Sequence, residues 1–151
     1  MTKKLHIYEP RIDTDSKKMD VGGLLIPPTN TITALLYGFA NTESFQAKEY
    51  YFWRLCDEFW NREDLPEKMM VNHPWAEEMI SAVIKNKYVA IGGAASSGKS
   101  HTMAAWGIIN WLSAPRDTLV LLTSTTLREA RKRIWGSVIS LLSVIEGAPL
   151  K

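Results

Sequence analysis

The sequence predicts an α/β fold, a parallel sheet with flanking helices, preceded by an irregular and helical N-terminal segment. Two short apolar segments, 88–91 and 118–123, have the composition of strands buried on both faces of a sheet. A helical pattern follows each segment, and this strand–helix alternation is typical of parallel sheets. A run of small residues, 92–98, joins the first segment to its helix. We therefore expect a right-handed βαβα unit within residues 72–151.

Composition excludes several classes of protein. The chain has 151 residues, of which 46% are hydrophobic and 23% charged, so it can bury one core and is not a disordered chain, a collagen-like fibre or a coiled-coil rod. Its single cysteine excludes a scaffold held by internal disulfides. No apolar run approaches the ~18 residues of a membrane-spanning helix, and charges stand where a signal peptide is apolar. We expect a soluble, intracellular protein without a membrane partner.

Residues 1–71 are expected to form an N-terminal arm and one helix. Residues 1–40 show no sustained period and contain Gly22-Gly23 and Pro27-Pro28, which predicts an irregular arm. Residues 43–61 carry aromatic and aliphatic side chains at helical spacing, and such a stripe is typical of core packing. The acidic pair Asp57-Glu58 lies on this helix rather than after a strand, so we interpret it as solvated surface.

Three helices are expected after residue 71. Asn72 or His73 can cap the first, with Pro74 in its opening turn. The second, 100–112, is apolar nearly all round and should be sandwiched between other elements. The third should begin with a capping box at Thr126–Glu129. The apolar faces expected for the first and third helices are Trp75, Met79, Ile80 and Val83, and Leu127, Ala130, Ile134, Trp135, Val138, Leu142 and Ile145.

The sequence between residues 93 and 100 fits the pattern G-x-x-x-x-G-K-[ST] in full. It lies between a predicted strand and an apolar helix, which is the context that this phosphate-binding motif (Walker A) requires. Its glycines allow backbone N–H groups to turn inward toward an anion, and the following helix adds its free donors. The motif predicts a site for a nucleoside triphosphate with Mg²⁺. The alternative is a glycine-rich turn that binds nothing.

Each residue type in the motif has a predicted role. The Lys99 ammonium would contact the β- and γ-phosphates as the catalytic residue, and the Ser100 hydroxyl would bind Mg²⁺. The predicted nucleotide-binding residues are Gly93, Ala94, Ala95, Ser96, Ser97, Gly98, Lys99, Ser100 and His101.

A second informative stretch follows the second predicted strand. Ser124, Thr125 and Arg128 combine hydroxyls with a basic group, and such residues could contact a phosphodiester backbone. The alternative is a capped helix with a basic outer face, because Arg128 and the cluster 131–133 avoid the apolar stripe. The formal net charge of only +2 does not by itself indicate a nucleic-acid-binding protein.

The run from Tyr88 to about Leu142, with GGAASSGKSHT, DTLVLLTSTT and LREARKRIWGSV, resembles the N-terminal ATPase of phage terminase large subunits. These proteins are motors that pump viral DNA into a prohead. The resemblance implies an incomplete P-loop NTPase fold, with ATP and Mg²⁺ as cofactors and ATP hydrolysis coupled to translocation of double-stranded DNA. It implies terminase small subunit and portal protein as further partners, a homo-oligomeric ring, and the cytoplasm of an infected bacterium. In the related helicases the segment after the second strand contacts nucleic-acid backbone, which favours Ser124, Thr125 and Arg128.

The sequence departs from the terminase pattern in three ways. The loop contains no arginine, so an arginine finger must come from elsewhere. Gln46, the sole glutamine, is too far upstream to read adenine, which leaves Trp75 or His73 as substitutes. No strand ending in Asp-Glu follows the loop, so nothing visible completes the Mg²⁺ shell or activates water. We expect the leading portion of a longer motor, which by itself binds nucleotide poorly and hydrolyses little.

Two other functions remain open from the sequence. A helicase-like, nucleic-acid-dependent P-loop ATPase would share the same loop residues. A non-catalytic interaction module would dock a partner through residues 1–70, and its binding would not depend on Lys99.

Overall fold

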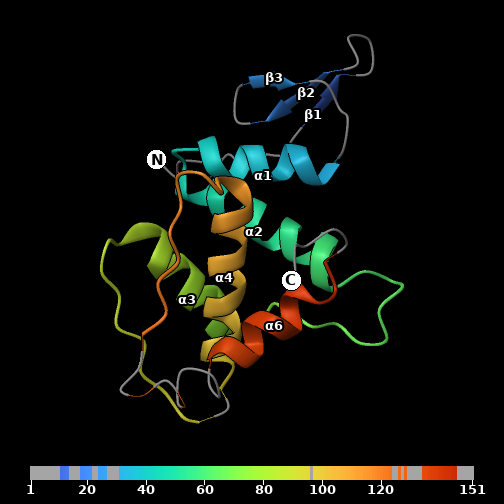
Figure 1. Cartoon of the computed structure of the whole chain (residues 1–151). Helices are drawn as coiled ribbons and strands as arrows, with labels where there is room; N and C mark the ends of the chain where they lie inside the picture. The colour runs from blue at the N-terminus through green and yellow to red at the C-terminus, as the bar shows by residue number, and fades with distance from the viewer. Residues whose placement is uncertain are drawn as a thin grey trace.

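The computed structural model describes residues 31–95, 97–123, 126, 128 and 134–145, together with the backbone of three short strands. These strands are β1 (Arg11–Asp13), β2 (Lys18–Val21) and β3 (Leu24–Ile26). They form an antiparallel sheet in the order β1-β2-β3, with Met19 of β2 opposite Ile12 on one side and Ile26 on the other. The sheet lies beside the first helix (Figure 1).

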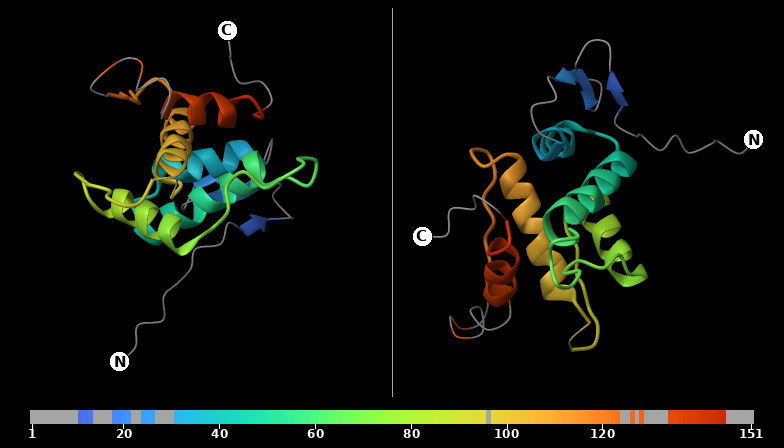
Figure 2. Two further views of the ribbon diagram at one scale, coloured as in Figure 1. Left: turned by 90° about the horizontal axis from the view of Figure 1, so that it is seen from below. Right: turned by 90° about the vertical axis from the view of Figure 1, so that its right-hand side faces the viewer.

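Helices make up most of the described part of the chain. Their bounds are α1 (Thr31–Asn41), α2 (Phe45–Trp60), α3 (Pro74–Lys85), α4 (Lys99–Ser113) and α6 (Gly136–Leu142). Helix α4 contacts all of the others, and it lies between α6 on one side and α2 and α3 on the other (Figure 2). The prediction of a sandwiched helix here is confirmed, because its apolar residues face several neighbours at once.

Side chains at the helix starts explain where two of the helices begin. The Ser44 hydroxyl accepts a hydrogen bond from the backbone N–H of Ala47 at 3.3 Å and caps α2. His73 Nδ1 accepts from the backbone N–H of Trp75 at 3.2 Å and caps α3, with Pro74 in its first turn. Both helices lie where the sequence predicts them.

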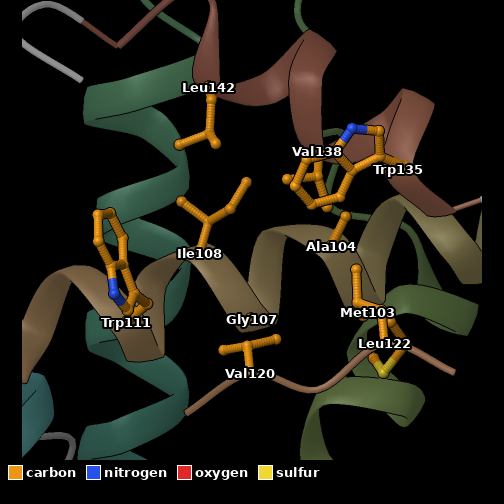
Figure 3. Close-up of a pocket in the computed structure, with 10 residues that line it drawn as sticks. All are labelled: Met103, Ala104, Gly107, Ile108, Trp111, Val120, Leu122, Trp135, Val138 and Leu142. Atoms are coloured by element: carbon orange, nitrogen blue, oxygen red, sulfur yellow. The ribbon is translucent and has the colours of Figure 1, made fainter. Parts of the chain in front are cut away.

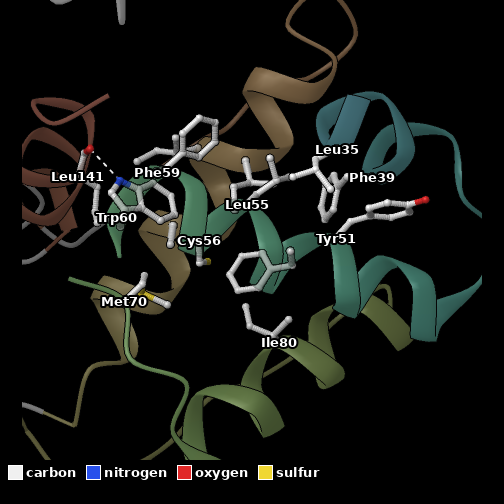
Figure 4. Packing of buried hydrophobic residues seen from close by; sticks show 14 of the residues in the cluster. Leu35, Phe39, Tyr51, Leu55, Cys56, Phe59, Trp60, Met70, Ile80 and Leu141 are labelled. Atoms are coloured by element: carbon white, nitrogen blue, oxygen red, sulfur yellow. Dashed lines mark hydrogen bonds between the residues drawn. The ribbon is translucent and has the colours of Figure 1, made fainter. Parts of the chain in front are cut away.

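The core is built mainly on the buried face of α2, as its aromatic stripe predicts (Figure 4). Trp60 is fully buried, and its indole N–H donates to the backbone carbonyl of Leu141 at 2.9 Å. The last carbonyls of a helix have no partner within it, so this bond satisfies one of them and anchors α6 to α2. The residues of the cluster with no exposed surface are Tyr51, Phe52, Leu55, Cys56, Trp60, Ala105, Ile109 and Leu141.

The connector after α2 is tied to both of its neighbours. The Asn61 amide donates to the Met70 carbonyl at 2.7 Å and accepts from the Met70 backbone N–H at 3.0 Å. His101 Nε2 lies 2.8 Å from the Met69 carbonyl oxygen. A carbonyl only accepts, so Nε2 carries the proton and donates. These bonds hold the first turn of α4 against the end of the connector.

The prediction of an α/β domain with a parallel sheet is wrong. Between residues 31 and 145 the described segments contain helices and irregular backbone but no strand. The segments 88–91 and 118–123, expected as central strands, are irregular. The strands that the structure does contain are antiparallel and lie near the N-terminus, within the part that the sequence predicts as an irregular arm.

The physical reason is that neither segment has a covering layer on both faces. Tyr88 is 84% exposed and Leu119 is 87% exposed, whereas a parallel strand is buried on both faces. The second segment packs one side only, against α4. A Cβ built on Gly107 would lie 3.2 Å from a methyl group of Val120, and Figure 3 shows Val120 beside this glycine. An apolar cavity of about 220 Å³ remains between this segment, α4 and α6.

Two other expectations are corrected by the structure, and a third lies at least partly outside the described residues. Residues 31–40, expected to belong to an irregular arm, are part of α1, and Ala34, Leu35 and Phe39 are buried in the core. The stripe predicted for the last helix omits Leu141, which is fully buried, and includes Trp135, which is 50% exposed. The capping box at Thr126–Glu129 and the basic cluster 131–133 lie at least partly outside the described residues. No helix in the described segments is long and apolar enough to cross a bilayer.

Candidate functional site

The loop that fits the phosphate-binding motif leads directly into α4. This helix begins at Lys99, and Gly98 occupies the capping position with φ +79° and ψ −1°. That left-handed backbone conformation is unfavourable for residues with a Cβ, so glycine is the residue that the turn requires. The predicted start of a helix directly after the loop is therefore confirmed, although the described segment that leads into the loop, 86–92, is irregular and not a strand.

The Lys99 side chain folds back across the loop. Its ammonium donates to the carbonyl of Gly93 at 3.0 Å, to the carbonyl of Ala94, and to the Ser97 hydroxyl at 2.9 Å. These contacts hold the positive charge at the mouth of the solvent-exposed loop. An ammonium has three donors, so a phosphate that enters the loop would have to replace one of these acceptors, and it would then bind the compact ammonium as a point charge.

A cavity of about 680 Å³ opens beside the loop, which is within the ~300–1,000 Å³ of small-molecule sites. One end is formed by the loop and Lys99, and the other by α3 and the residue that caps it. The lining residues are His73, Trp75, Glu78, Met79, Ala82, Val89, Ala90, Ile91, Gly92, Gly93, Ala94, Ser97 and Lys99.

The electrostatics of the cavity differ between its two ends. Among the described lining residues, Lys99 supplies the ammonium and Glu78 supplies the carboxylate. Helix α4 also directs its N-terminus, the positive end of its dipole, toward the loop. The loop end therefore favours an anion, while the α3 end is apolar with one acidic group at its edge.

The other predicted nucleotide-binding residues occupy different places. Ala95 is exposed in the loop, and Ser96 lies outside the described residues. Ser100 is half-buried in the first turn of α4, one residue after the lysine. His101 turns to the connector, where it is hydrogen-bonded to Met69. The structure thus brings Gly93, Ala94, Ser97 and Lys99 together in one cavity wall, and it places His101 elsewhere.

A bound Mg²⁺ ion would take its ligands from the phosphates as well as from the Ser100 hydroxyl. The described residues contain no group of three or more His, Cys, Asp or Glu side chains that could hold a metal. Mg²⁺ usually keeps several waters and takes only one or two protein ligands plus substrate phosphates. Ser100 supplies one hydroxyl on the first turn of α4, beside the predicted phosphate-binding loop, which is the number of protein ligands that this mode of binding requires.

The acidic pair on α2 belongs to the surface. Arg54 lies 3.9 Å from Asp57 and 3.4 Å from Glu58, and all three side chains are substantially exposed. The interpretation of this pair as solvated surface is confirmed.

Two of the three predicted DNA contacts lie outside the described residues. Ser124 and Thr125 are not described, and Arg128 is described only as an exposed residue. Their proposed role therefore stays a prediction.

Sequence reasoning identified Trp75 and His73 only as substitutes for a missing glutamine, but both line the cavity with Lys99. The expectation that Trp75 belongs to the buried face of α3 is wrong. It is 68% exposed, whereas Ala76, Met79 and Ile80 are buried. Residues 75, 78, 79 and 82 recur at helical spacing, so the sequence did contain a signal for one face of α3 turned toward the loop.

No protein-family model, curated protein or solved structure was found to match this chain.

Proposed function

We propose that this chain binds a nucleoside triphosphate, ATP by the terminase resemblance, together with Mg²⁺ through the loop 93–100. The observation that carries the proposal is the position of Lys99. Its ammonium is held at the mouth of a glycine-rich loop that opens on a cavity of about 680 Å³. An anion entering there would meet a fixed positive charge and the N-terminus of a helix together.

The proposed roles of the residues follow from their chemistry. Lys99 would bind the β- and γ-phosphates, the backbone N–H groups of the loop would bind the remaining oxygens, and Ser100 would contribute its hydroxyl to Mg²⁺. When bound, the metal would neutralise phosphate charge. Gly98 keeps the backbone free to turn between the loop and the helix.

The proposal rests on the loop and on α4, and not on a parallel sheet. Lys99 holds the loop from its helical side, and the bond between His101 and Met69 fixes the first turn of α4 to the connector. The loop residues from Gly92 to Ala95 are exposed, so part of the phosphate would remain in contact with water. We therefore expect weak binding and little hydrolysis by this chain alone.

We further propose that the nucleotide-binding part belongs to a DNA-packaging ATPase of the terminase type. This step is supported by the resemblance of residues 88–142, which includes the loop and the basic segment after it. The partners would be double-stranded DNA, a terminase small subunit and a portal protein, in a ring of identical subunits. The reaction would take place in the cytoplasm of an infected bacterium.

A binding experiment tests the first proposal. Fluorescently labelled ATP with Mg²⁺ is titrated into the wild-type chain, the Lys99→Ala variant and the Lys87→Ala variant. A hydrogen bond to a charged group contributes about 1.5–3 kcal/mol, so Lys99→Ala should weaken binding by about tenfold or more. Lys87 stacks over Tyr88 at 5.6 Å from the ring centre and lies outside the cavity lining, so its variant should bind like the wild type. Equal affinity in all three proteins would refute the proposal.

A packaging experiment tests the second proposal. In a reaction that moves double-stranded DNA into proheads, Lys99→Ala should abolish ATP-driven packaging, while Lys87→Ala should leave it intact. Normal packaging by Lys99→Ala would contradict the motor assignment. Tight binding of a partner protein that is unaffected by Lys99→Ala would instead support an interaction module.

A further inference from the structure

The part of the cavity lining that lies outside the loop is mostly apolar. It is formed by α3, which contributes Trp75, Met79 and Ala82, and by Val89 and Ile91 from the irregular segment before the loop. These surfaces are apolar, and they are continuous with the loop in a single cavity. A ligand whose phosphates lie at Lys99 therefore extends toward an apolar wall that contains one large aromatic ring.

Trp75 is exposed on this wall and has a defined backbone position. Its side chain is 68% exposed, although tryptophan is highly buried on average. The cap of α3 fixes its backbone, because His73 Nδ1 accepts the Trp75 N–H at 3.2 Å. Its neighbours Ala76, Met79 and Ile80 provide the buried face of α3. The indole of Trp75 is thus presented to the cavity instead of the core.

The charges of the cavity set the direction in which a nucleotide would lie. Lys99 and the N-terminus of α4 attract phosphate at the loop end. The Glu78 carboxylate on α3 repels phosphate from the other end. The neutral, flat part of a nucleotide is therefore directed to the wall that carries Trp75.

We propose that the base of the bound nucleoside triphosphate stacks on the indole of Trp75, an inference that rests on the proposed function. Aromatic stacking recognises the π-face that every base has, so it is tolerant of base identity. This site binds ATP and GTP with similar affinity, and Trp75 supplies most of the difference in affinity between a nucleotide and its bare phosphate chain.

A comparison of two ligands separates the base from the phosphates. Calorimetric titrations with ATP and with inorganic tripolyphosphate, both with Mg²⁺, are made on the wild type and on Trp75→Ala. Loss of a stacked base predicts that Trp75→Ala weakens ATP binding about five- to 150-fold and leaves tripolyphosphate binding unchanged. Trp75→Phe keeps an aromatic face and should retain most of the affinity for ATP. Trp135→Ala removes a half-exposed tryptophan from a different cavity and should change neither ligand.

Several results would overturn the base-stacking inference. One is that Trp75→Ala weakens both ligands equally, which would indicate a structural role. Another is that ATP binds no more tightly than tripolyphosphate to the wild type. If tripolyphosphate binding still depends on Lys99 in these cases, the proposed function stands without the base subsite. If the wild type binds neither ligand, both proposals fail.

Discussion

The ammonium nitrogen of Lys99 donates to the carbonyl oxygen of Gly93 at 3.0 Å, which links the first residue of α4 to the first residue of the loop. The Lys99 side chain thereby joins the two ends of the loop, and the left-handed conformation of Gly98 turns the backbone between the loop and α4. The charge is positioned by backbone carbonyls, and it does not depend on a neighbouring acidic side chain. This relationship explains how a loop that fits the phosphate-binding motif can be held at the end of a helix in a part of the chain that forms no sheet among its described residues.

We expect the Ser97 hydroxyl to compete with a bound phosphate for the Lys99 ammonium. An ammonium has three donors, and Gly93, Ala94 and Ser97 occupy all of them in this structure. A phosphate must replace one of these acceptors. Ser97→Ala should therefore raise the affinity for tripolyphosphate about two- to tenfold, in line with the ~0.5–1.5 kcal/mol of one hydrogen bond. Calorimetry measures the change, and a lower affinity would show that the hydroxyl itself binds phosphate.

Substitutions at Gly98 and Gly92 test whether the loop backbone requires a left-handed turn. A Cβ added at either position meets nothing within 4 Å, but only Gly98 of these two has a positive φ, +79°. Gly98→Ala should therefore cost about 1–2 kcal/mol in the conformation shown, and it should weaken ATP binding as the loop rearranges. Gly92 also lines the cavity but its φ is not in the left-handed region, so Gly92→Ala should weaken ATP binding less than Gly98→Ala does. Equal effects of the two substitutions would contradict the requirement for a left-handed turn.

The bond between Trp60 and Leu141 predicts a specific loss of stability. Trp60→Phe keeps an aromatic ring but leaves the Leu141 carbonyl buried without its donor, which should lower the free energy of unfolding by about 1–3 kcal/mol. Urea denaturation measures this value. Trp135→Phe serves as the control because Trp135 is half-exposed, and its effect should stay within about 0.5 kcal/mol. Similar losses in both variants would refute a special role for the buried bond.

The burial of Cys56 predicts that the free energy of unfolding depends on pH. Burial raises the pKa of its thiol well above the usual value, and the nearby Asp57 adds to this effect. The thiol of the unfolded chain ionises at a lower pH than the buried thiol of the folded chain. Burial of Cys56 therefore makes its full contribution to the free energy of unfolding below about pH 8.5, and this contribution is lost as pH rises further. The stability advantage of the wild type over Cys56→Ala should therefore shrink above that pH.

A labelling experiment checks the same thiol. In the folded chain at pH 8 a thiol reagent should leave Cys56 unmodified, because the side chain has no exposed surface. In denaturant the reaction should go to completion. Rapid labelling of the folded protein would contradict its burial.

Helices α2, α3 and α4 could be predicted from the sequence because their signals are local. The stripe of α2, the His73 cap of α3 and the apolar circumference of α4 depend on spacing within a single segment. The loop-to-helix junction at Gly98 and Lys99 could be predicted for the same reason, because its chemistry is contained in one short motif.

The sheet could not be predicted correctly because strands depend on partners distant in the sequence. Segments 88–91 and 118–123 have strand-like composition, but neither pairs with another strand among the described residues. The antiparallel strands near the N-terminus were missed even though Gly22-Gly23, between β2 and β3, is a typical hairpin signal. The exposure of Trp75 could not be predicted because the helical spacing of apolar residues does not show which of them the neighbouring segments cover.

Protection of Lys99 from acylation tests the central claim most directly, because it reports on the residue and the ligand together. The chain is treated with an amine-reactive ester with and without saturating Mg²⁺–ATP, and each lysine is quantified by mass spectrometry. We predict that ATP and tripolyphosphate reduce the labelling of Lys99 and leave that of Lys87 unchanged. Labelling of Lys99 that is the same with and without ATP would contradict a nucleoside triphosphate site in this loop.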